Sequence, residues 1–497
     1  MPCVSAESLG FSYSDRVQLL DGLNFRLTDR WYGLVGANGS GKTTLANLIV
    51  GELVPTTGRI LLEPKDAVVA VCRQEQKGIS AAIFAFSRSD RNEDFRVRGQ
   101  FGLNPNDIDR FETLSPGERK RWQLATALSA SPDVLIVDEP TNHLDEVAKI
   151  RLFELLKGFR GVGIIISHDR VLLDELTVST LRLHDTTISQ YPKNYSGARV
   201  LWTVEAEQRE RFRQVLCKRQ DALVERIFQA KRGKEAASKQ RSAGARMKNI
   251  HDHDGSSFAR TERAANGEAR ISRQIGLVEA ELRRVREKIP EFVEDKTMGR
   301  SIFVDYVLAP TPKICALTGE SIRVGSRTIL HHVHVALDRD ARVHLKGPNG
   351  SGKTKLIEAI LSRVNAAHDR ILYLPQEFKS ETSLTLKHNI LNLERATRGR
   401  TLSILAALGV EPSRVLDSVN YSPGEARKIY LALGLGAHAW ALVLDEPTNH
   451  MDLPSIERLE KALAAFPGAI LLVSHDKVFA QACTDKVWSI ENGYVKS

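Results

Sequence analysis

Two stretches of the chain, residues 4–192 and 313–497, repeat one pattern of apolar and polar positions. Each contains an apolar run of strand length that ends in Asp-Glu, at 134–139 and 441–446. Each also contains a later apolar run that ends in Ser-His-Asp. Strand-length apolar runs that alternate with helical stretches predict a mainly parallel sheet with helices packed on it. We therefore expect an α/β fold that is built twice.

The spacing of equivalent residues indicates that the second stretch is a duplicate of the first. In both copies the serine of a Ser-Pro-Gly-Glu sequence lies 24 residues before the Glu, and this Glu lies 29 residues before the His. Copy one holds an extra turn at 55–58 near its beginning, which copy two lacks. We predict two related domains, 1–192 and 313–497, with a different segment, 193–312, between them.

The segment between the copies has the pattern of a helical hairpin. Its second half carries a heptad seam, in which apolar residues recur in steps of four and three. The seam consists of Ile271, Ile275, Val278, Leu282, Val285 and Ile289. We expect its partner to be an earlier, less regular helical run through Val204, Phe212, Val215, Leu223 and Ile227. Residues 244–267 lack a seam and predict the tip of the hairpin, and Pro290 predicts the end of its second helix.

The charge of the chain is concentrated in this hairpin. Residues 209–273 contain 17 Lys and Arg against 8 Asp and Glu, which equals the net charge of +9 of all 497 residues. A concentrated basic segment favours a polyanionic partner such as RNA. The alternative is a solvated spacer with an incidental run of charge.

Composition narrows the class of protein. No run approaches the roughly 20 apolar residues that a membrane-spanning helix needs, and the chain does not begin with a basic-then-apolar signal region. The five cysteines include no C-x-x-C pair, which argues against a zinc or disulfide framework. We therefore expect a cytoplasmic protein.

A phosphate-binding loop occurs in each copy. Residues 36–44 and 347–355 fit G-x-x-x-x-G-K-[ST], and each follows a strand-like run and opens a helical one. The glycines let backbone N–H groups turn toward a polyphosphate at the positive end of the new helix. Two ordinary glycine-rich turns are the alternative. The candidate ligands are Gly36, Ala37, Asn38, Gly39, Ser40, Gly41, Lys42, Thr43 and Thr44, with Gly347, Pro348, Asn349, Gly350, Ser351, Gly352, Lys353, Thr354 and Lys355.

Other polar residues fall at matching places in both copies. Ser-Pro-Gly-Glu predicts a capping box, which presents free N–H groups and a hydroxyl to an anion or is only a well-capped helix. The predicted anion-binding residues there are Ser115, Gly117, Ser422 and Gly424. The strand-end carboxylates and hydroxyls suit Mg²⁺, and we assign Thr43, Gln74, Asp138, Thr354, Gln376 and Asp445 to it. The predicted catalytic residues, which polarise water and bond the γ-phosphate, are Glu139, Glu446, His168 and His475.

Together these motifs resemble ATP-binding cassettes, above all the runs at 138–145 and 445–452, Asp-Glu-Pro-Thr-Asn-His-Leu-Asp and Asp-Glu-Pro-Thr-Asn-His-Met-Asp. Two cassettes in one chain, joined by a charged helical linker, resemble the ABC-F family over nearly the whole chain. The resemblance implies ATP and Mg²⁺ as cofactors, and cassettes that pair head to tail within a monomer. Each ATP would lie between one P-loop and the Ser-Pro-Gly-Glu of the other cassette. It also implies action on the ribosome, with the linker directed toward tRNA and rRNA.

The chain departs from the family pattern at three places. Pro116 and Pro423 stand where Gly is commoner in the family signature. The aromatic residue that stacks on adenine in the family corresponds to Tyr13 in copy one, and an alignment through Leu20 and Leu330 places Arg323 there in copy two. The tip contains His251-Asp252-His253-Asp254, which fits a metal site or, more simply, a solvated turn.

Three function classes compete. The favoured one is an ATPase that binds ribosomes, either as a general translation factor or as a protector against ribosome-targeting antibiotics. The second is an energy-supplying subunit of a membrane transporter, against which the linker and the fusion of two cassettes stand. The third is a DNA-repair or chromosome ATPase, a class that tends to carry zinc modules or far longer coiled coils.

Overall fold

The computed structural model describes residues 1–14, 17–74, 78–141, 146–244, 256–288, 303, 306–348, 350–364, 370–376, 382–417 and 421–496. The chain forms two compact units. One is made of Met1–Ala198 and Asp295–Ser497 and holds both cassettes, and the other is Arg199–Glu294.

Cassette one is built on a six-stranded sheet in the order β5-β6-β7-β3-β8-β9. The strands are β3 (Trp31–Gly36), β5 (Val69–Cys72), β6 (Val134–Asp138), β7 (Val162–Ile166), β8 (Ser179–His184) and β9 (Thr187–Tyr191). All neighbours pair parallel except β8 and β9. Every residue of β3, β6 and β7 is buried, because helices cover both faces of a parallel sheet. The mainly parallel sheet predicted from the apolar runs is confirmed.

Helices surround this sheet and carry the predicted motifs at their beginnings. They are α1 (Lys42–Val50), α2 (Ala81–Ser87), α3 (Asn92–Phe101), the 3₁₀ helix η1 (Pro105–Thr113), α4 (Pro116–Ser129), α5 (Glu146–Lys157) and α6 (Arg170–Leu176). The P-loop joins β3 to α1, and Ser115 precedes α4. The parallel strands thereby bring the ends of β3, β6 and β7 to one edge, where nucleotide sites of such sheets form.

Cassette two repeats the architecture in the order β13-β14-β15-β12-β16-β17. Its strands are β12 (Arg342–Lys346), β13 (Ile371–Leu374), β14 (Ala441–Asp445), β15 (Ala469–Val473), β16 (Lys486–Glu491) and β17 (Tyr494–Lys496). Its helices are α9 (Lys353–Ser362), α10 (Thr382–Leu391), α11 (Arg395–Ala407), α12 (Pro412–Asp417), α13 (Pro423–Gly436), α14 (Leu453–Ala465) and α15 (Lys477–Cys483). The predicted fold class, two P-loop α/β cassettes joined by a helical hairpin, is confirmed.

Each cassette also has a smaller antiparallel sheet, whose first two strands precede the P-loop. In cassette one it has the order β2-β1-β4, with β1 (Cys3–Ser14), β2 (Val17–Leu27) and β4 (Thr57–Glu63). In cassette two the described residues form only β10 (Lys313–Val324) and β11 (Arg327–Asp338). The extra turn at 55–58 leads into β4, so the longer spacing in copy one corresponds to a third strand.

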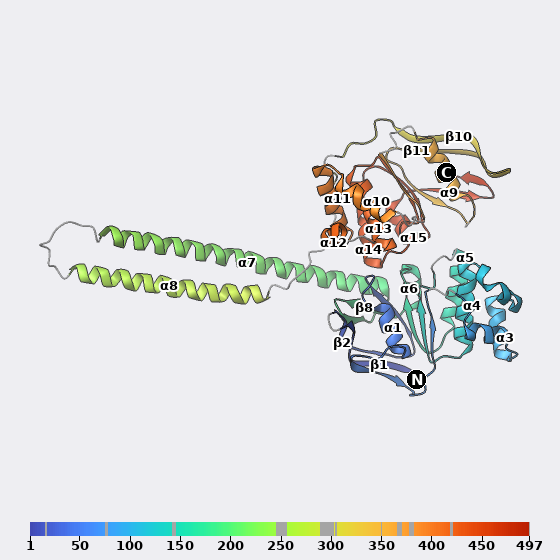
Figure 1. Ribbon diagram of the computed structural model, residues 1–497, viewed down its shortest axis with the longest axis horizontal. Coiled ribbons are helices and arrows are strands. Elements are labelled where there is room, and N and C mark those ends of the chain that lie inside the picture. The colour runs from blue at the N-terminus through green and yellow to red at the C-terminus, as the bar shows by residue number, and fades with distance from the viewer. Residues whose placement is uncertain are drawn as a thin grey trace. The chain divides into compact units, whose positions relative to one another are not determined.

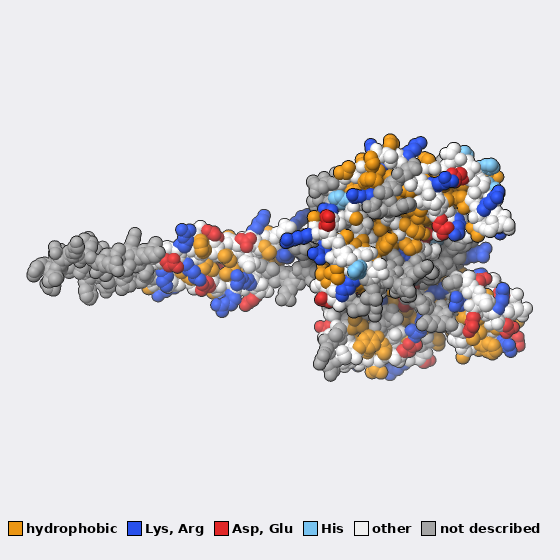
Figure 2. Space-filling model, turned by 45° about the horizontal axis from the view of Figure 1, so that its top comes forward, with side chains coloured by type: hydrophobic (Ala, Val, Ile, Leu, Met, Phe, Trp, Pro, Cys, Tyr) orange, Lys and Arg blue, Asp and Glu red, His pale blue; other side chains and the backbone are white. Residues whose placement is uncertain are grey.

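The second unit is an antiparallel pair of helices, α7 (Tyr195–Gly244) and α8 (Ser256–Lys288), which lie side by side in Figure 1. Leu216, Leu223 and Ile227 of α7 form one buried cluster with residues of the predicted heptad seam on α8. Arg219 and Lys231 add ion pairs across the helices, to Glu281 and Glu279. Basic and acidic side chains are interspersed along the described part of this unit (Figure 2).

Part of the predicted seam on α7 is wrong. Val204, Phe212 and Val215 are 46%, 60% and 62% exposed, and Leu216 takes the place assigned to Val215. Successive helical residues point about 100° apart, so burial of Leu216 turns Val215 outward. Leu216 clusters with Val285, close to the last described turn of α8, so earlier residues of α7 lie beyond the part that α8 covers.

Some sequence predictions lie outside the described residues. They concern Ile289 and Pro290, residues 245–255 of the tip with their His-Asp cluster, and Asn349. The predicted tip, 244–267, is too long, because α7 continues to Gly244 and α8 begins at Ser256. Within the described ranges, no helix combines the length and the apolar character that crossing a lipid bilayer requires.

Candidate nucleotide-binding site

The two P-loops adopt the same backbone. Gly39 and Gly350 both have φ of 78°, and Gly41 and Gly352 have φ of 98° and 97°, a region that favours glycine. Gly41 and Gly352 precede α1 and α9 without a side-chain cap, so no cap side chain covers the first N–H groups of these helices. These groups and the helix dipole are available to an anion.

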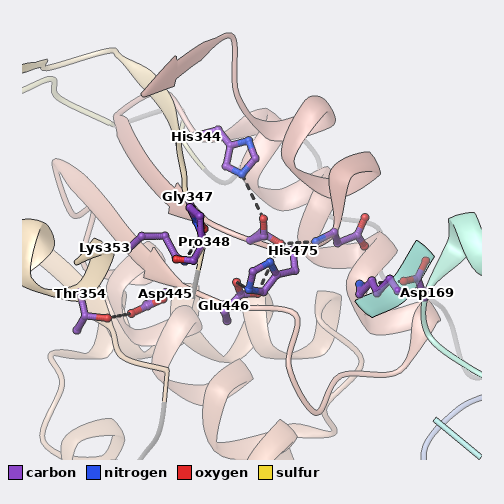
Figure 3. Close-up of polar contacts among 12 residues, drawn as sticks. Asp169, His344, Gly347, Pro348, Lys353, Thr354, Asp445, Glu446 and His475 are labelled. Atoms are coloured by element: carbon purple, nitrogen blue, oxygen red, sulfur yellow. Dashed lines mark hydrogen bonds and ion pairs between the residues drawn. The ribbon is translucent and has the colours of Figure 1, made fainter. Parts of the chain in front are cut away.

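The P-loop lysines fold back over their own loops. The Nζ of Lys42 donates to the carbonyl oxygens of Gly36 (2.9 Å) and Ala37 (2.8 Å), and Lys353 does the same to Gly347 (2.8 Å) and Pro348 (3.0 Å) (Figure 3). Burial lowers the pKa of both lysines, although the nearby acidic side chains act to raise it. Each loop thus holds a positive charge where phosphates would lie.

Each cassette brings a hydroxyl and a carboxylate together beside the P-loop. The Oγ1 of Thr43 donates to Oδ2 of Asp138 at 3.4 Å, and Thr354 donates to Asp445 at 3.3 Å. Burial raises the pKa of both aspartates, although nearby cations and the threonine oppose it. Hydroxyl and carboxylate oxygens are ligands that Mg²⁺ prefers, so this pair fits a Mg²⁺ bound with the phosphates.

The strand-end glutamates are buried next to histidines. Oε1 of Glu139 lies 3.1 Å from Nε2 of His168, and Oε1 of Glu446 lies 3.5 Å from Nε2 of His475. Burial, together with the neighbouring aspartate, raises the pKa of Glu139 to about 8. Burial likewise raises the pKa of Glu446 to about 7 and lowers that of His168 to about 4. A glutamate whose pKa lies near neutrality is suited to accept a proton from water.

The backbone at both glutamates is unusual. Glu139 has φ of 45° and Glu446 has φ of 49°, in the left-handed region that non-glycine residues rarely adopt. The strand hydrogen-bonding continues through this turn, because the N–H of Glu139 donates to Ile166 and that of Glu446 donates to Val473. The turn directs each carboxyl group away from its strand and toward the P-loop.

Several polar atoms at this site are buried and make no hydrogen bond with the described residues. They include the hydroxyls of Ser40 and Ser351. Buried polar atoms of native proteins nearly always have partners. Their grouping around the P-loops fits a polar ligand, as a nucleotide with its metal and water would be.

One cavity of about 1200 Å³ joins these groups. Its walls include the predicted residues Tyr13, Asn38, Gly39, Gly41, Lys42, Thr43, Thr44, Gln74, Asp138, Glu139, His168, Gly350, Gly352, Lys353, Thr354, Lys355, Gln376, Ser422, Gly424, Asp445, Glu446 and His475. Ser422 and Gly424 of cassette two thus share a cavity with the P-loop of cassette one. Ser115 and Gly117 are not among the lining residues, so the mirror-image arrangement is not formed in this structure.

Direct contacts join the two cassettes around this cavity. The backbone N–H of Asn38 donates to Oδ2 of Asp452 at 2.6 Å, and its side chain donates to the carbonyl of His450 at 3.3 Å. Arg170, which begins α6, is buried and lies 2.7 Å from Glu460 of α14. One turn earlier on α14, Glu457 accepts a hydrogen bond of 2.7 Å from Tyr195. Sequence reasoning assigned no role to Asp452, Arg170 or Glu460.

The predicted capping boxes are confirmed. The Ser115 hydroxyl accepts from the N–H of Glu118, whose carboxylate accepts from the N–H of Ser115 at 2.8 Å. Ser422 and Glu425 repeat this geometry at the start of α13. The hydroxyl and the N–H of Ser115 both donate to the Glu118 carboxylate, which lowers the pKa of Glu118.

The predicted match between Tyr13 and Arg323 is wrong. On β1, Ser12 pairs with Gln18 and Ser14 with Val17, so Tyr13 is an additional residue in a bulge. On β10, Arg323 and Val324 pair with consecutive residues of β11 and no such bulge intervenes. Tyr13, 68% exposed and hydrogen-bonded to Thr44 at 3.2 Å, lines the cavity, whereas Val324 does so in cassette two.

Comparison with known proteins agrees with this geometry. The ABC transporter family matches residues 20–142 and 330–449. The ribosome protection protein VmlR of Bacillus subtilis is 31% identical over 475 residues, which cover 93% of this chain and 82% of VmlR. The chain belongs to the ABC-F family of ATP-binding cassette proteins.

Other ABC-F relatives align over most of the chain as well. The erythromycin resistance ATP-binding protein MsrA of Staphylococcus epidermidis is 27% identical, over 92% of this chain and 91% of MsrA. Among solved structures, the RNase-L inhibitor superposes with a TM-score of 0.60 and 16% identity, over 98% of this chain and 90% of that one. This last likeness concerns the fold of the paired cassettes.

Proposed function

We propose that this ABC-F protein binds two Mg²⁺-ATP molecules between its cassettes, hydrolyses them to ADP and phosphate, and thereby acts on the ribosome in the cytoplasm. The observation that carries the ATPase assignment is the shared cavity, in which the P-loop of cassette one faces Ser422 and Gly424 of cassette two. The hydrogen bond between Asn38 and Asp452 supports the same pairing.

The residues of each site divide into three tasks. Lys42 and Lys353, with the P-loop N–H groups, would hold the phosphates. Thr43, Asp138 and Gln74, and in cassette two Thr354, Asp445 and Gln376, would hold Mg²⁺, which neutralises charge on the transferring phosphate. Glu139 and Glu446 would each orient and deprotonate a water molecule, while His168 and His475 position the glutamate and the γ-phosphate.

The ribosome as partner is supported by the relatives and by charge. VmlR is named a ribosome protection protein, and MsrA is named for erythromycin resistance. The net charge of +9 in residues 209–273 suits contact with rRNA or tRNA, whose phosphates bind basic side chains largely without regard to sequence. The transporter-subunit alternative is not favoured, because the ABC-F relatives VmlR and MsrA are named for ribosome protection and for antibiotic resistance.

The test is sedimentation of a double variant, Glu139→Gln with Glu446→Gln, through a sucrose gradient with ATP. Removing only the proton acceptors should leave ATP binding intact and trap the closed state on the ribosome. We expect ATP-dependent co-sedimentation with ribosomes and ATPase activity reduced at least a hundredfold. The matched control, Glu7→Gln with Glu491→Gln, changes two exposed glutamates. ATPase activity near that of the unaltered protein would contradict the catalytic assignment.

A second experiment addresses the linker. Neutralising Arg241, Arg246 and Lys248 should weaken ribosome binding and reduce its dependence on salt concentration, because fewer counterions are released. Neutralising three basic residues on the cassettes, Arg59, Arg110 and Arg363, serves as the control. Unchanged affinity and salt dependence in the linker variant would make the linker a spacer.

Between the two roles within translation, the names of VmlR and MsrA favour ribosome protection. Expression of the gene in a sensitive bacterium should then raise the inhibitory concentration of a ribosome-targeting antibiotic, and the double Glu→Gln variant should not. Equal sensitivity with and without the gene, across the main classes of such antibiotics, would favour a general translation factor.

A further inference from the structure

A buried cation occupies the same position in both cassettes. Lys120 of α4 and Arg427 of α13 each lie five residues after the serine of the capping box. Lys120 is 7% exposed and Arg427 is 1% exposed. Removing a charged side chain from water is costly, so residues of this kind are rarely buried unless they are held by specific partners.

The partners of both cations are backbone carbonyls at the ends of two strands. The Nζ of Lys120 donates to the carbonyl oxygens of Arg73 (2.6 Å) and Asp138 (2.9 Å). Arg427 donates from Nη1 to the carbonyl of Glu446 at 3.0 Å and from Nη2 to that of Gln376. Each cation therefore joins the segment that carries the Mg²⁺-site glutamine to the segment that carries the catalytic glutamate.

The same side chain also belongs to the helix that serves the opposite nucleotide. Ser115 caps α4 and Ser422 caps α13. Ser422 lines the cavity beside the P-loop of cassette one, and in the proposed head-to-tail pairing Ser115 would take the equivalent place beside the P-loop of cassette two. Within one rigid helix of 14 residues, the cap and the cation move together. A shift of Gln74 or Glu139 on ATP binding at one site therefore has a short, hydrogen-bonded route to the cap at the other site.

We propose that Lys120 and Arg427 are positioning residues that couple the two ATP sites of this protein. ATP bound to one cassette would shift the glutamine and glutamate segments of that cassette. The cation would pass this shift to the capping-box serine on its own helix, and this serine completes the opposite site. The inference rests on the proposed ATPase function and on the sharing of each ATP between cassettes.

Two further observations support this role. The Lys120 ammonium counteracts the burial that raises the pKa of Asp138 and Glu139, and the Arg427 guanidinium acts in the same direction on Asp445. The two copies also differ in the cation used, yet each cation brings a positive charge and donates to two backbone carbonyls.

The test isolates one site at a time. Site one holds Lys42 and Glu139, and site two holds Lys353 and Glu446. In a Glu139→Gln background only site two hydrolyses ATP, although Lys120 contacts the glutamine and glutamate segments of site one. Adding Lys120→Met should lower the turnover of site two roughly tenfold to a hundredfold, the effect of losing hydrogen bonds from a charged donor. Lys120→Arg should restore most of it, as Arg427 does this work in cassette two.

The reciprocal experiment uses Glu446→Gln, in which Arg427→Met should lower turnover at site one and Arg427→Lys should restore it. Arg59→Met, which alters an exposed arginine of cassette one, is the control and should change neither rate. Unchanged turnover at site two with Lys120→Met would overturn the coupling and leave the cation a purely local role.

The same variants distinguish coupling from a role in which Lys120 only fills space in the core. Equal losses for Lys120→Met and Lys120→Arg, accompanied by the same drop in thermal unfolding temperature, would mean that the side chain only fills space, and would overturn the inference. Failure of the proposed ATPase function itself would show separately, as normal hydrolysis by the double Glu139→Gln, Glu446→Gln variant.

Discussion

The backbone N–H of Asn38, in the P-loop of cassette one, donates a hydrogen bond of 2.6 Å to the carboxylate of Asp452 in cassette two. The other carboxylate oxygen of Asp452 accepts from the N–H of Ser455 at 2.9 Å and so caps α14. Burial would raise the pKa of Asp452, but Ser455, Lys428 and the Asn38 N–H together lower it. One ionised side chain therefore fixes both the start of α14 and the P-loop of the other cassette.

Replacing this aspartate should separate its two tasks. Asp452→Ala should lower the free energy of unfolding by about 1 kcal/mol through loss of the cap, and should also weaken ATP binding at site one. Asp452→Asn keeps one oxygen, which can still cap α14, but its NH2 group would then face the N–H of Asn38. This variant should stay within roughly 0.5 kcal/mol of the unaltered protein in free energy of unfolding and should still weaken ATP binding at site one. Chemical denaturation and ATP titration would check this. Equal losses of unfolding free energy for the two substitutions would show that the charge, and not the cap, stabilises the fold.

The stability of the ATP-free protein should fall as the pH rises above neutrality. Because the pKa of Glu139 is about 8 when folded and 4.5 as a free side chain, the folded state holds a proton that the unfolded state releases. This contribution is complete below pH 4.5 and is lost as the pH rises through about 8. His168, with its pKa lowered from 6.5 to about 4, acts oppositely, but its contribution is complete above pH 6.5.

The measurement is therefore thermal unfolding between pH 6.5 and 8.5. The unfolding temperature of the unaltered protein should fall over this range more steeply than that of Glu139→Gln, whose side chain stays neutral. Glu7→Gln, at an exposed glutamate, should follow the unaltered protein. Parallel curves for the unaltered protein and Glu139→Gln would contradict the raised pKa.

The two sites should differ in their hold on the adenine base. Tyr13 offers an aromatic face at site one, whereas Val324 offers an aliphatic one at site two. Stacking of a base on an aromatic ring contributes roughly 1–3 kcal/mol, so Tyr13→Ala should raise the Kd for ATP at site one about tenfold or more. Tyr13→Phe keeps the ring and should have little effect, and Val324→Ala should barely change site two.

Each Kd is measurable with the other site disabled, by Lys353→Ala for site one and Lys42→Ala for site two. If Val324→Ala weakens binding as much as Tyr13→Ala does, the ring contributes no special stacking.

The ion pair between Arg170 and Glu460 should contribute to the pairing of the cassettes. Its side chains are only 3% and 19% exposed, so removing one partner leaves a poorly solvated charge. Arg170→Met should cost roughly 3–5 kcal/mol in free energy of unfolding. The exposed pair of Arg59 and Glu7 is the comparison, and Arg59→Met should cost less than about 1 kcal/mol. A loss as small as that of Arg59→Met would assign the pair no role in stability.

The sequence predicted what depends on local pattern. Strands such as β6 and β14 are continuous apolar runs because helices cover both faces, and the capping box at Ser115 is complete within four residues. These features need no knowledge of the rest of the chain. The sheet, the P-loops and the residues around the strand-end glutamates were predictable for this reason.

What depends on register or on distant contacts was not predictable. A bulge at Tyr13 shifts the count by one residue, so Arg323 was matched wrongly. The burial of Leu216 rather than Val215 depends on which face of α7 packs against α8. The contact between Asn38 and Asp452 joins residues 414 positions apart, and no local pattern marks either as a partner.

The left-handed backbone at Glu139 and Glu446 bears on how such a protein evolves. A non-glycine residue at φ of 45° or 49° costs about 1–2 kcal/mol, and glycine adopts the same angles freely. Replacement of either glutamate by glycine would therefore relieve strain and also remove a buried carboxyl group, while ending hydrolysis at that site. A substitution that ends ATP hydrolysis at this position would then increase the free energy of unfolding. We therefore expect that both glutamates are retained only where ATP hydrolysis at both sites is under selection. Where that selection ends at one site, its glutamate should be replaced, and the cassette should become inactive but more stable.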